Sequence, residues 1–356
     1  MVLAPMAGVT NVAYRSLCRR HGHGLFVSEM VGARALVEGD HRTALKAAFS
    51  PDEDVRSIQL YGVDPDDVEQ AVGLLVDEDR VEHIDLNFGC PAPKVTRHGG
   101  GAALPWHNGL FEDIVTAAVG AAGAVPVTVK TRLGIDDDHL TYLRTALTAQ
   151  RVGVAAIGLH ARTAAQRYSG HADWDRIADL VRAVDIPVLG NGDIWEAADA
   201  LRMMEVTGCA GVIVGRGCLG RPWLFRDLQA AFEGRPVPPG PTLGEVADLM
   251  SEHARGLADL FGQDIGLRQF RKHPGWYLQG FAVGRSLRRE LAQVETLAEL
   301  AALLERVDHD ELFNDEVRRQ PRGHTTGTKR VPLPHGWLEA ADDRRPVVAA
   351  AAVSGG

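Results

Sequence analysis

Short apolar runs recur along roughly the first 220 residues, and longer amphipathic stretches separate them. The runs have the length and the β-branched content of strands, and the stretches between them have the periodicity of helices. Eight such β–α units predict a TIM (β/α)8 barrel over residues 1–232. The eight expected strands are Val2–Met6, Leu25–Ser28, Ser57–Tyr61, His83–Asn87, Pro126–Lys130, Ala155–His160, Pro187–Asn191 and Gly211–Gly215.

A different hydrophobic pattern follows the barrel. Glu233–Gly244 is rich in proline and glycine and is interpreted as a linker, and residues 245–312 regain a helical period. We therefore expect a small C-terminal all-helical domain there. Residues 313–356 are polar, proline-bearing and finally alanine-rich, so a mostly disordered tail is expected, with local docking at Val331–Leu338.

Polar or glycine residues end each apolar run. In a barrel these positions meet at the C-terminal mouth, where active sites lie. A doubly wound sheet is the competing architecture, but the GxGxxG fingerprint after the first run is missing. The sequence thus concentrates its candidate chemistry at one rim.

Composition narrows the class of protein. The 356 residues carry a formal net charge of −9, which argues against a nucleic-acid-binding surface spread over the whole chain. Residues 265–290 are the exception, with a net charge of +5 and interleaved aromatics; Trp276 and Phe281 are assigned to the core. A solvated helix face would explain the same charges, so an RNA-binding surface and a plain helix face both remain open.

The four cysteines form no CxxC pair, and no leader or long apolar span stands out. We therefore expect a cytoplasmic protein without a metal site or a disulfide framework. His160 has no second ligand at metal-binding spacing on its strand.

Cys90 lies in the loop that follows the fourth run, between glycine and proline residues. A buried structural thiol is the usual state of a free cysteine, but the place of Cys90 at the mouth favours a functional thiol. Cys18, Cys209 and Cys218 keep the structural interpretation. Lys94 and a Gly99–Gly101 stretch extend the Cys90 loop and indicate a segment that closes over an anionic ligand.

Lys130 and His160 end the fifth and sixth runs. A lysine aimed into a barrel mouth needs an anion, either a ligand or a neighbouring carboxylate such as Asp85 or Glu29. His160 could donate a hydrogen bond, and Arg162 could hold a phosphate. Both possibilities place cofactor or substrate contacts at these two strand ends.

The last two runs end in GNGDI (190–194) and GRG (215–217). Loops after strands seven and eight form the usual phosphate site of a barrel, because glycine lets backbone N–H groups approach the anion. Together with Arg216, these loops predict a phosphorylated cofactor.

The motifs resemble, in order, those of the tRNA-dihydrouridine synthases, in particular the bacterial B-type branch. The resemblance spans about residues 2–312 and rests on APMAGVTN (4–11), QLYG (59–62), NFGCPAPKV (87–95), VKTRLG (129–134), HARTAAQRYSG (160–170), GNGDI, GRGCLGRPW (215–223) and RKHPGWY (271–277). Family members usually carry a short segment before the first strand, so a true start upstream of Met1 is expected.

The resemblance implies an FMN-bound barrel, NADPH as reductant and tRNA as partner of the helical domain. It implies Cys90 as the proton donor for reduction of the uracil C5–C6 bond in D-loop uridines. FMN contacts are implied for Pro5, Met6, Ala7, Gln59, Lys130, His160, Asn191, Gly192, Asp193, Gly215 and Arg216. Substrate contacts are expected at Asn87, Lys94, Arg162, Arg268, Arg271 and Lys272.

Two other functions fit part of this pattern. An FMN barrel oxidoreductase acting on a free small molecule, similar to a dihydroorotate dehydrogenase, would explain the barrel but not the basic helical domain. A catalytically idle RNA-binding protein would leave Cys90 and Lys130 without a task. A monomer is expected in each case.

Overall fold

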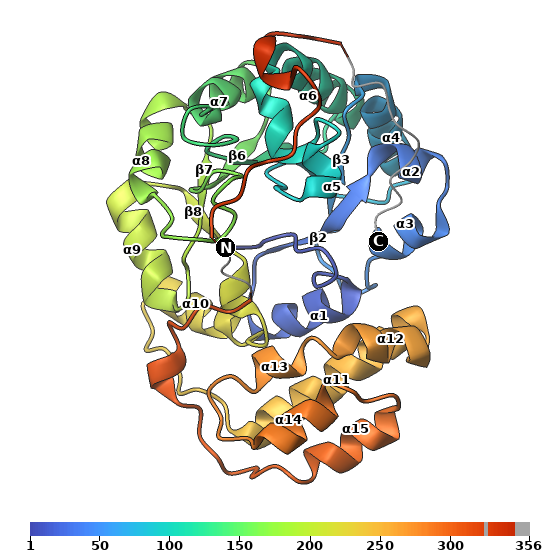
Figure 1. The fold of residues 1–356 in the computed structure, drawn as a ribbon, viewed down its shortest axis with the longest axis vertical. Coiled ribbons are helices and arrows are strands. Elements are labelled where there is room, and N and C mark those ends of the chain that lie inside the picture. The colour runs from blue at the N-terminus through green and yellow to red at the C-terminus, as the bar shows by residue number, and fades with distance from the viewer. Residues whose placement is uncertain (324–326, 346–356) are drawn as a thin grey trace.

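The computed structural model describes residues 1–323 and 327–345. Eight parallel strands close into a barrel, each pairing with its sequence neighbours and β1 pairing with β8 (Figure 1). The strands are β1 (Val2–Leu3), β2 (Leu25–Gly32), β3 (Ser57–Tyr61), β4 (His83–Phe88), β5 (Val127–Arg132), β6 (Ala156–His160), β7 (Val188–Asn191) and β8 (Gly211–Val214). The predicted TIM barrel is confirmed.

Helices surround the barrel and bury its apolar outer face. They are α1 (Val12–His21), α2 (Ala33–Val37), α3 (His41–Lys46), α4 (Pro65–Asp77), α5 (Pro93–Thr96), α6 (Asn108–Ala122), α7 (Tyr142–Arg151), α8 (Trp174–Ala183), α9 (Ala197–Thr207) and α10 (Leu224–Phe232). Short 3-10 helices η1 (Gly101–Trp106) and η2 (Arg216–Cys218) lie in loops at the mouth.

Some strand ends differ from the expected ones. β1 ends at Leu3, before the expected Met6, whereas β2 and β5 continue to Gly32 and Arg132. The pairing of β2 with β3 shifts register between Val27 and Met30. Glu29 had marked the end of β2 in the sequence, but it lies within the strand, and its buried carboxylate accepts the Gly8 N–H at 2.6 Å.

In the described part of the chain, five α-helices follow the linker, and the first of them packs against α1 (Figure 1). The first begins at a capping box, in which Glu245 N–H donates to Thr242 Oγ1 and Thr242 N–H donates to Glu245 Oε2. Gly256 lets this helix approach Ala13 of α1 closely. The five are α11 (Leu243–Phe261), α12 (Gln263–Phe270), α13 (Pro274–Tyr277), α14 (Arg285–Leu291) and α15 (Leu297–Leu304).

The C-terminal residues differ from the expected disordered tail. The Arg322 side chain is buried and donates to the carbonyls of Leu219 and Trp276, and Trp337 is buried against the barrel. These contacts order a segment whose composition alone favours disorder. The segment contains two short 3-10 helices, η3 (Asp315–Val317) and η4 (Trp337–Glu339). The rest of the expected tail, residues 324–326 and 346–356, lies outside the described residues. Within the described part, no helix is both long and apolar enough to cross a bilayer.

Candidate active site at the barrel mouth

A cavity of about 540 Å³ opens at the C-terminal ends of the strands. Residues that end each of the eight strands contribute to its wall, as the closed barrel geometry requires. The sequence-predicted residues that line it are Pro5, Met6, Ala7, Gln59, Asn87, Cys90, Lys130, His160, Arg162, Asn191, Gly192, Asp193, Gly215 and Arg216.

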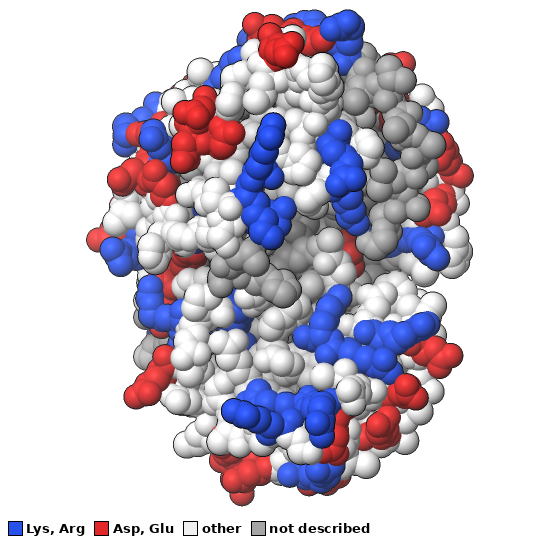
Figure 2. Space-filling model, viewed as in Figure 1, with Lys and Arg blue, Asp and Glu red and all other residues white. Residues whose placement is uncertain are grey.

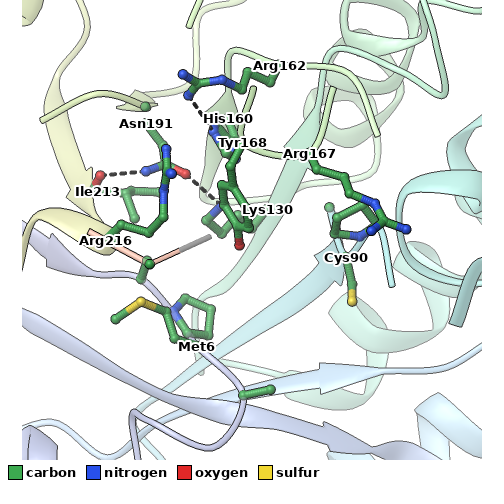
Figure 3. Close-up of a pocket in the computed structure, with 18 of the residues that line it drawn as sticks. Met6, Cys90, Lys130, His160, Arg162, Arg167, Tyr168, Asn191, Ile213 and Arg216 are labelled. Atoms are coloured by element: carbon green, nitrogen blue, oxygen red, sulfur yellow. Dashed lines mark hydrogen bonds between the residues drawn. The ribbon is translucent and has the colours of Figure 1, made fainter. Parts of the chain in front are cut away.

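Lys130 lines the cavity with a partly buried side chain. Its Nζ donates to Asn191 Oδ1 at 2.9 Å, and Asn191 Nδ2 donates to the Ile213 carbonyl at 2.7 Å (Figure 3). Neither Asp85 nor Glu29 forms an ion pair with it among the described residues. Burial lowers the pKa of Lys130 to about 8, with Arg132 adding to the shift. An anionic ligand beside Lys130 would favour its charged form and so offset the free-energy cost of burying the ammonium.

A relay of side chains orients Asn87. Gln59 Nε2 donates to Asp85 at 2.7 Å, and Gln59 Oε1 accepts from Asn87 Nδ2 at 2.7 Å. Asn87 Oδ1 accepts hydrogen bonds from the N–H groups of Gly89 and Cys90, at 3.1 and 2.9 Å. Burial raises the pKa of Asp85 to about 6. Asn87 therefore holds the start of the Cys90 loop in addition to lining the cavity.

Cys90 borders the cavity, whereas the other three cysteines are buried away from it. Figure 3 shows its thiol set apart from the cluster of Lys130, His160 and Asn191. Burial raises the pKa of the Cys90 thiol, against smaller opposing effects of the Ala92 N–H and nearby cations. The group is a thiol at neutral pH, and it can give a proton.

His160 and Arg162 form one network at the end of β6. Arg162 donates to both carboxylate oxygens of Asp193, at 2.7 and 2.8 Å, and to the carbonyls of Ser169 and Gly170. Its Nη1 also donates to His160 Nε2 at 3.4 Å. Burial and neighbouring cations lower the His160 pKa well below its usual value, so the imidazole is neutral. The Arg162 charge is matched by Asp193, and the pair fixes two loops together.

The loops after β7 and β8 expose backbone toward the cavity. Gly192 has φ +129°, where a Cβ would lie 2.6 Å from the Ala172 Cβ, and a Cβ on Gly217 would lie 2.1 Å from the Ile194 carbonyl oxygen. The Arg216 guanidinium lies between the rings of Tyr168 and Trp195, with centroid distances of 4.4 and 5.1 Å. Glycine backbone without side chains and a guanidinium stacked on aromatic rings are features suited to binding phosphate.

Several lining residues were not identified from the sequence. Arg132 donates to the carbonyls of Gly89, Thr163 and Arg167 and so ties the Cys90 loop to the β6 loop. The sequence did indicate that Arg132 lines the cavity, because Arg132 lies two positions after Lys130 on the same strand and so faces the same side. Trp276 was assigned to the core, but it lines the cavity, whereas Phe281 is buried as expected.

A second, larger cleft of about 1080 Å³ lies between the barrel and α12, and the last residues of α11, Leu260 and Phe261, also line it. Lys94, Arg268 and Lys272 line it, and Figure 2 shows Lys and Arg side chains on this face over both the barrel and the helical domain. Lys272 donates to the Gly8 carbonyl, while Glu29 accepts the Gly8 N–H. Both backbone polar groups of Gly8 are thereby hydrogen-bonded, one to the barrel and one to the helical region.

Arg271 is placed differently from its neighbours. Its Nε donates to the Val294 carbonyl at 2.9 Å and its Nη2 lies 3.3 Å from Glu295, away from both clefts. Within residues 1–323 and 327–345, no three His, Cys, Asp or Glu side chains converge as metal ligands.

Comparison with known proteins assigns this fold and site to a class. The model of the dihydrouridine synthase family matches residues 2–314. A probable tRNA-dihydrouridine synthase of Mycobacterium tuberculosis is 55% identical and covers 100% of this chain and 94% of its own length. The tRNA-dihydrouridine synthase B of Shewanella oneidensis is 39% identical, over 86% of this chain and 94% of its own.

Among solved structures, a histamine dehydrogenase from Rhizobium matches with a TM-score of 0.50 at 11% identity, over 88% of this chain and 63% of that one. That likeness concerns the fold alone. The chain belongs to the dihydrouridine synthase family.

Proposed function

We propose that this protein is an FMN-dependent tRNA-dihydrouridine synthase that reduces the C5–C6 bond of D-loop uridines, with NADPH as the source of electrons. The observation that carries the proposal is Cys90, a protonated thiol beside a cation-lined cavity, in a chain of this family. The names of the relatives support tRNA as the substrate.

The cavity fits FMN in size and in charge. Its volume of about 540 Å³ falls in the range of cofactor pockets, ~300–1,000 Å³. Gly192, Gly215 and Gly217 leave backbone accessible near Arg216, which suits the phosphate. Lys130 would face the isoalloxazine, and its buried charge suits the anionic reduced ring. Pro5, Met6 and Ala7 from the loop after β1, with Gln59 of β3, would complete the contacts.

When bound and reduced, the flavin would supply a hydride to C6 of the uracil. Cys90 would then deliver its proton to C5, which a thiol can do and a thiolate cannot. Asn87, at the end of β4, would orient the base, and neutral His160 would lie beside the ring. Proton and hydride together account for both atoms added across the double bond.

The second cleft supports a folded RNA as substrate. Its cationic lining lies beside the catalytic cavity, and a uridine must leave its stacked context to reach a barrel mouth. Lys94, Arg268 and Lys272 would contact phosphates there, while Arg271, bonded within the helical domain, would act through the fold. We propose that the enzyme works as a cytoplasmic monomer.

The test is single-turnover reduction of tRNA purified from a strain that lacks dihydrouridine. Cys90→Ala should lower dihydrouridine formation by about 10²–10⁴-fold, because it removes the proton donor. Reduction of the flavin by NADPH should be unchanged, since it does not need the thiol.

Cys209→Ala is the matched control, because Cys209 is buried away from the cavity. It should retain turnover. If the wild-type protein binds FMN yet forms no dihydrouridine and instead reduces a free pyrimidine, the small-molecule oxidoreductase alternative replaces this proposal.

A further inference from the structure

Residues 327–345, here called the C-terminal strap, cross the rim of the barrel mouth and reach α6 (Figure 1). They lie beyond the residues that the family model matches. Lys329 N–H donates to the Ala165 carbonyl at 2.9 Å at one end, and Arg344 pairs with Glu112 of α6 at 2.9 Å at the other. The strap is fixed to the barrel at both ends.

Trp337 anchors the middle of the strap. Its ring stacks on His107 with centroids 3.7 Å apart and planes within 10°. Its Nε1 donates to the Ala103 carbonyl at 3.1 Å, and His107 Nε2 donates to the Trp337 carbonyl at 2.8 Å. The side chain is 6% exposed. The stacking and the two hydrogen bonds make this a specific binding site for the Trp337 side chain on the barrel.

Ala103, which accepts the Trp337 N–H, lies in η1, and η1 also contacts the backbone of Cys90. Ala102 N–H donates to the Cys90 carbonyl at 3.0 Å. Gly101, at φ +56°, packs so closely that a Cβ there would lie 2.5 Å from the same oxygen. Ala103, the acceptor of the Trp337 N–H, is therefore the next residue after Ala102, whose N–H donates to Cys90.

We infer that the C-terminal strap positions the catalytic thiol, with Trp337 as a positioning residue that acts through η1. The inference rests on the proposed function for the role of the thiol, but not for the mechanical link. Without the indole, the Ala103 carbonyl loses its donor and His107 its stacking partner, so η1 loosens and the Cys90 loop with it. Small misplacements of a reacting group cost large factors in rate.

Two measurements on the full-length, FMN-loaded protein test the link. The first is the rate of Cys90 alkylation by iodoacetamide, followed by peptide mass; the second is single-turnover dihydrouridine formation. Trp337→Ala should speed alkylation and slow turnover, each by about tenfold, with tRNA affinity within about twofold of wild type. Trp337→Phe keeps the stacked ring but lacks the N–H donor. Both of its rates should therefore fall between those of wild type and those of Trp337→Ala.

Leu338→Ala is the control, since this neighbour in η4 is 37% exposed. Folded Trp337→Ala with both rates equal to those of Leu338→Ala would overturn the inference. If Trp337→Ala does not fold, Trp337→Phe decides: equal alkylation of Trp337→Phe and Leu338→Ala overturns it. A wild type that forms no dihydrouridine would refute the proposed function, while the alkylation rates would still decide the link.

Discussion

Single residues at the mouth owe their properties to burial. Lys130 keeps its ammonium in a water-poor place with an amide oxygen as partner, and its pKa falls to about 8 as a result. The lysine is therefore charged at neutral pH but loses its proton at a pH that is easy to reach. A ligand anion beside it would favour the charged form.

We expect the affinity of the apoprotein for FMN to fall as the pH rises above about 8. The sign follows from the lowered pKa: below it Lys130 is a cation that attracts the ligand, and above it the attraction is lost. Lys130→Met should weaken binding at pH 7 and abolish this pH dependence. Flavin fluorescence titrations from pH 6.5 to 9.5 measure both, and a persistent slope in Lys130→Met would contradict the assignment.

At this scale the polar and glycine residues after the apolar runs indicated the mouth, although β1, β2 and β5 end at other residues than expected. The sequence did not identify the partners of these residues. Arg162 was expected to meet a phosphate, but it is bonded to Asp193, 31 positions away. Such a pair forms only when β6 and β7 are neighbours, so local sequence carries no sign of it.

Among the elements, the turn after β8 depends on the absence of a side chain. Gly217 places η2 against the loop after β7, where a Cβ would lie 2.1 Å from the Ile194 carbonyl oxygen. The loops after β7 and β8 can approach each other only because residue 217 has no side chain.

Gly217→Ala should destabilise the protein by ~1–3 kcal/mol, a usual cost of overpacking, and lower FMN affinity about tenfold or more. Gly73→Ala is the matched control, since nothing lies within 4 Å of its Cβ in α4. There alanine should stabilise the helix by ~0.5–1 kcal/mol. Thermal unfolding of the apoproteins separates the two, and equal melting temperatures would refute the packing argument.

Element prediction succeeded where order is local and failed where it comes from distant contacts. The strands and the capped α11 carry their own patterns of hydrophobic and capping residues. The C-terminal segment does not: its order derives from Trp337 against His107 and from Arg322 against loop carbonyls. Composition alone therefore indicated disorder.

At the scale of the whole molecule, charge is distributed unevenly. The net charge is −9, yet residues 265–290 carry +5, so the remainder carries −14. Cations line the cleft between the barrel and the helical domain, and Arg268 is one of them. An RNA bound there would release counterions.

We expect Arg268→Ala to weaken tRNA binding and to reduce the slope of log Kd against log salt by about 1, the loss of one phosphate contact. FMN content should not change. Arg182→Ala on α8, whose partner is Asp179 on the barrel exterior, is the control and should leave the slope as it is. Filter binding from 50 to 300 mM KCl gives both slopes, and equal slopes would place the RNA elsewhere.

The two backbone groups of Gly8 have a consequence for modularity. The Gly8 N–H donates to Glu29 of the barrel and the Gly8 carbonyl accepts from Lys272 of the helical region, directly after Ala7, which lines the cavity. The barrel and the helical region thus both hold the same residue of this loop. A chimera that grafts a relative's helical region onto this barrel has to bring a lysine at this position, or the cofactor loop loses one of its two supports.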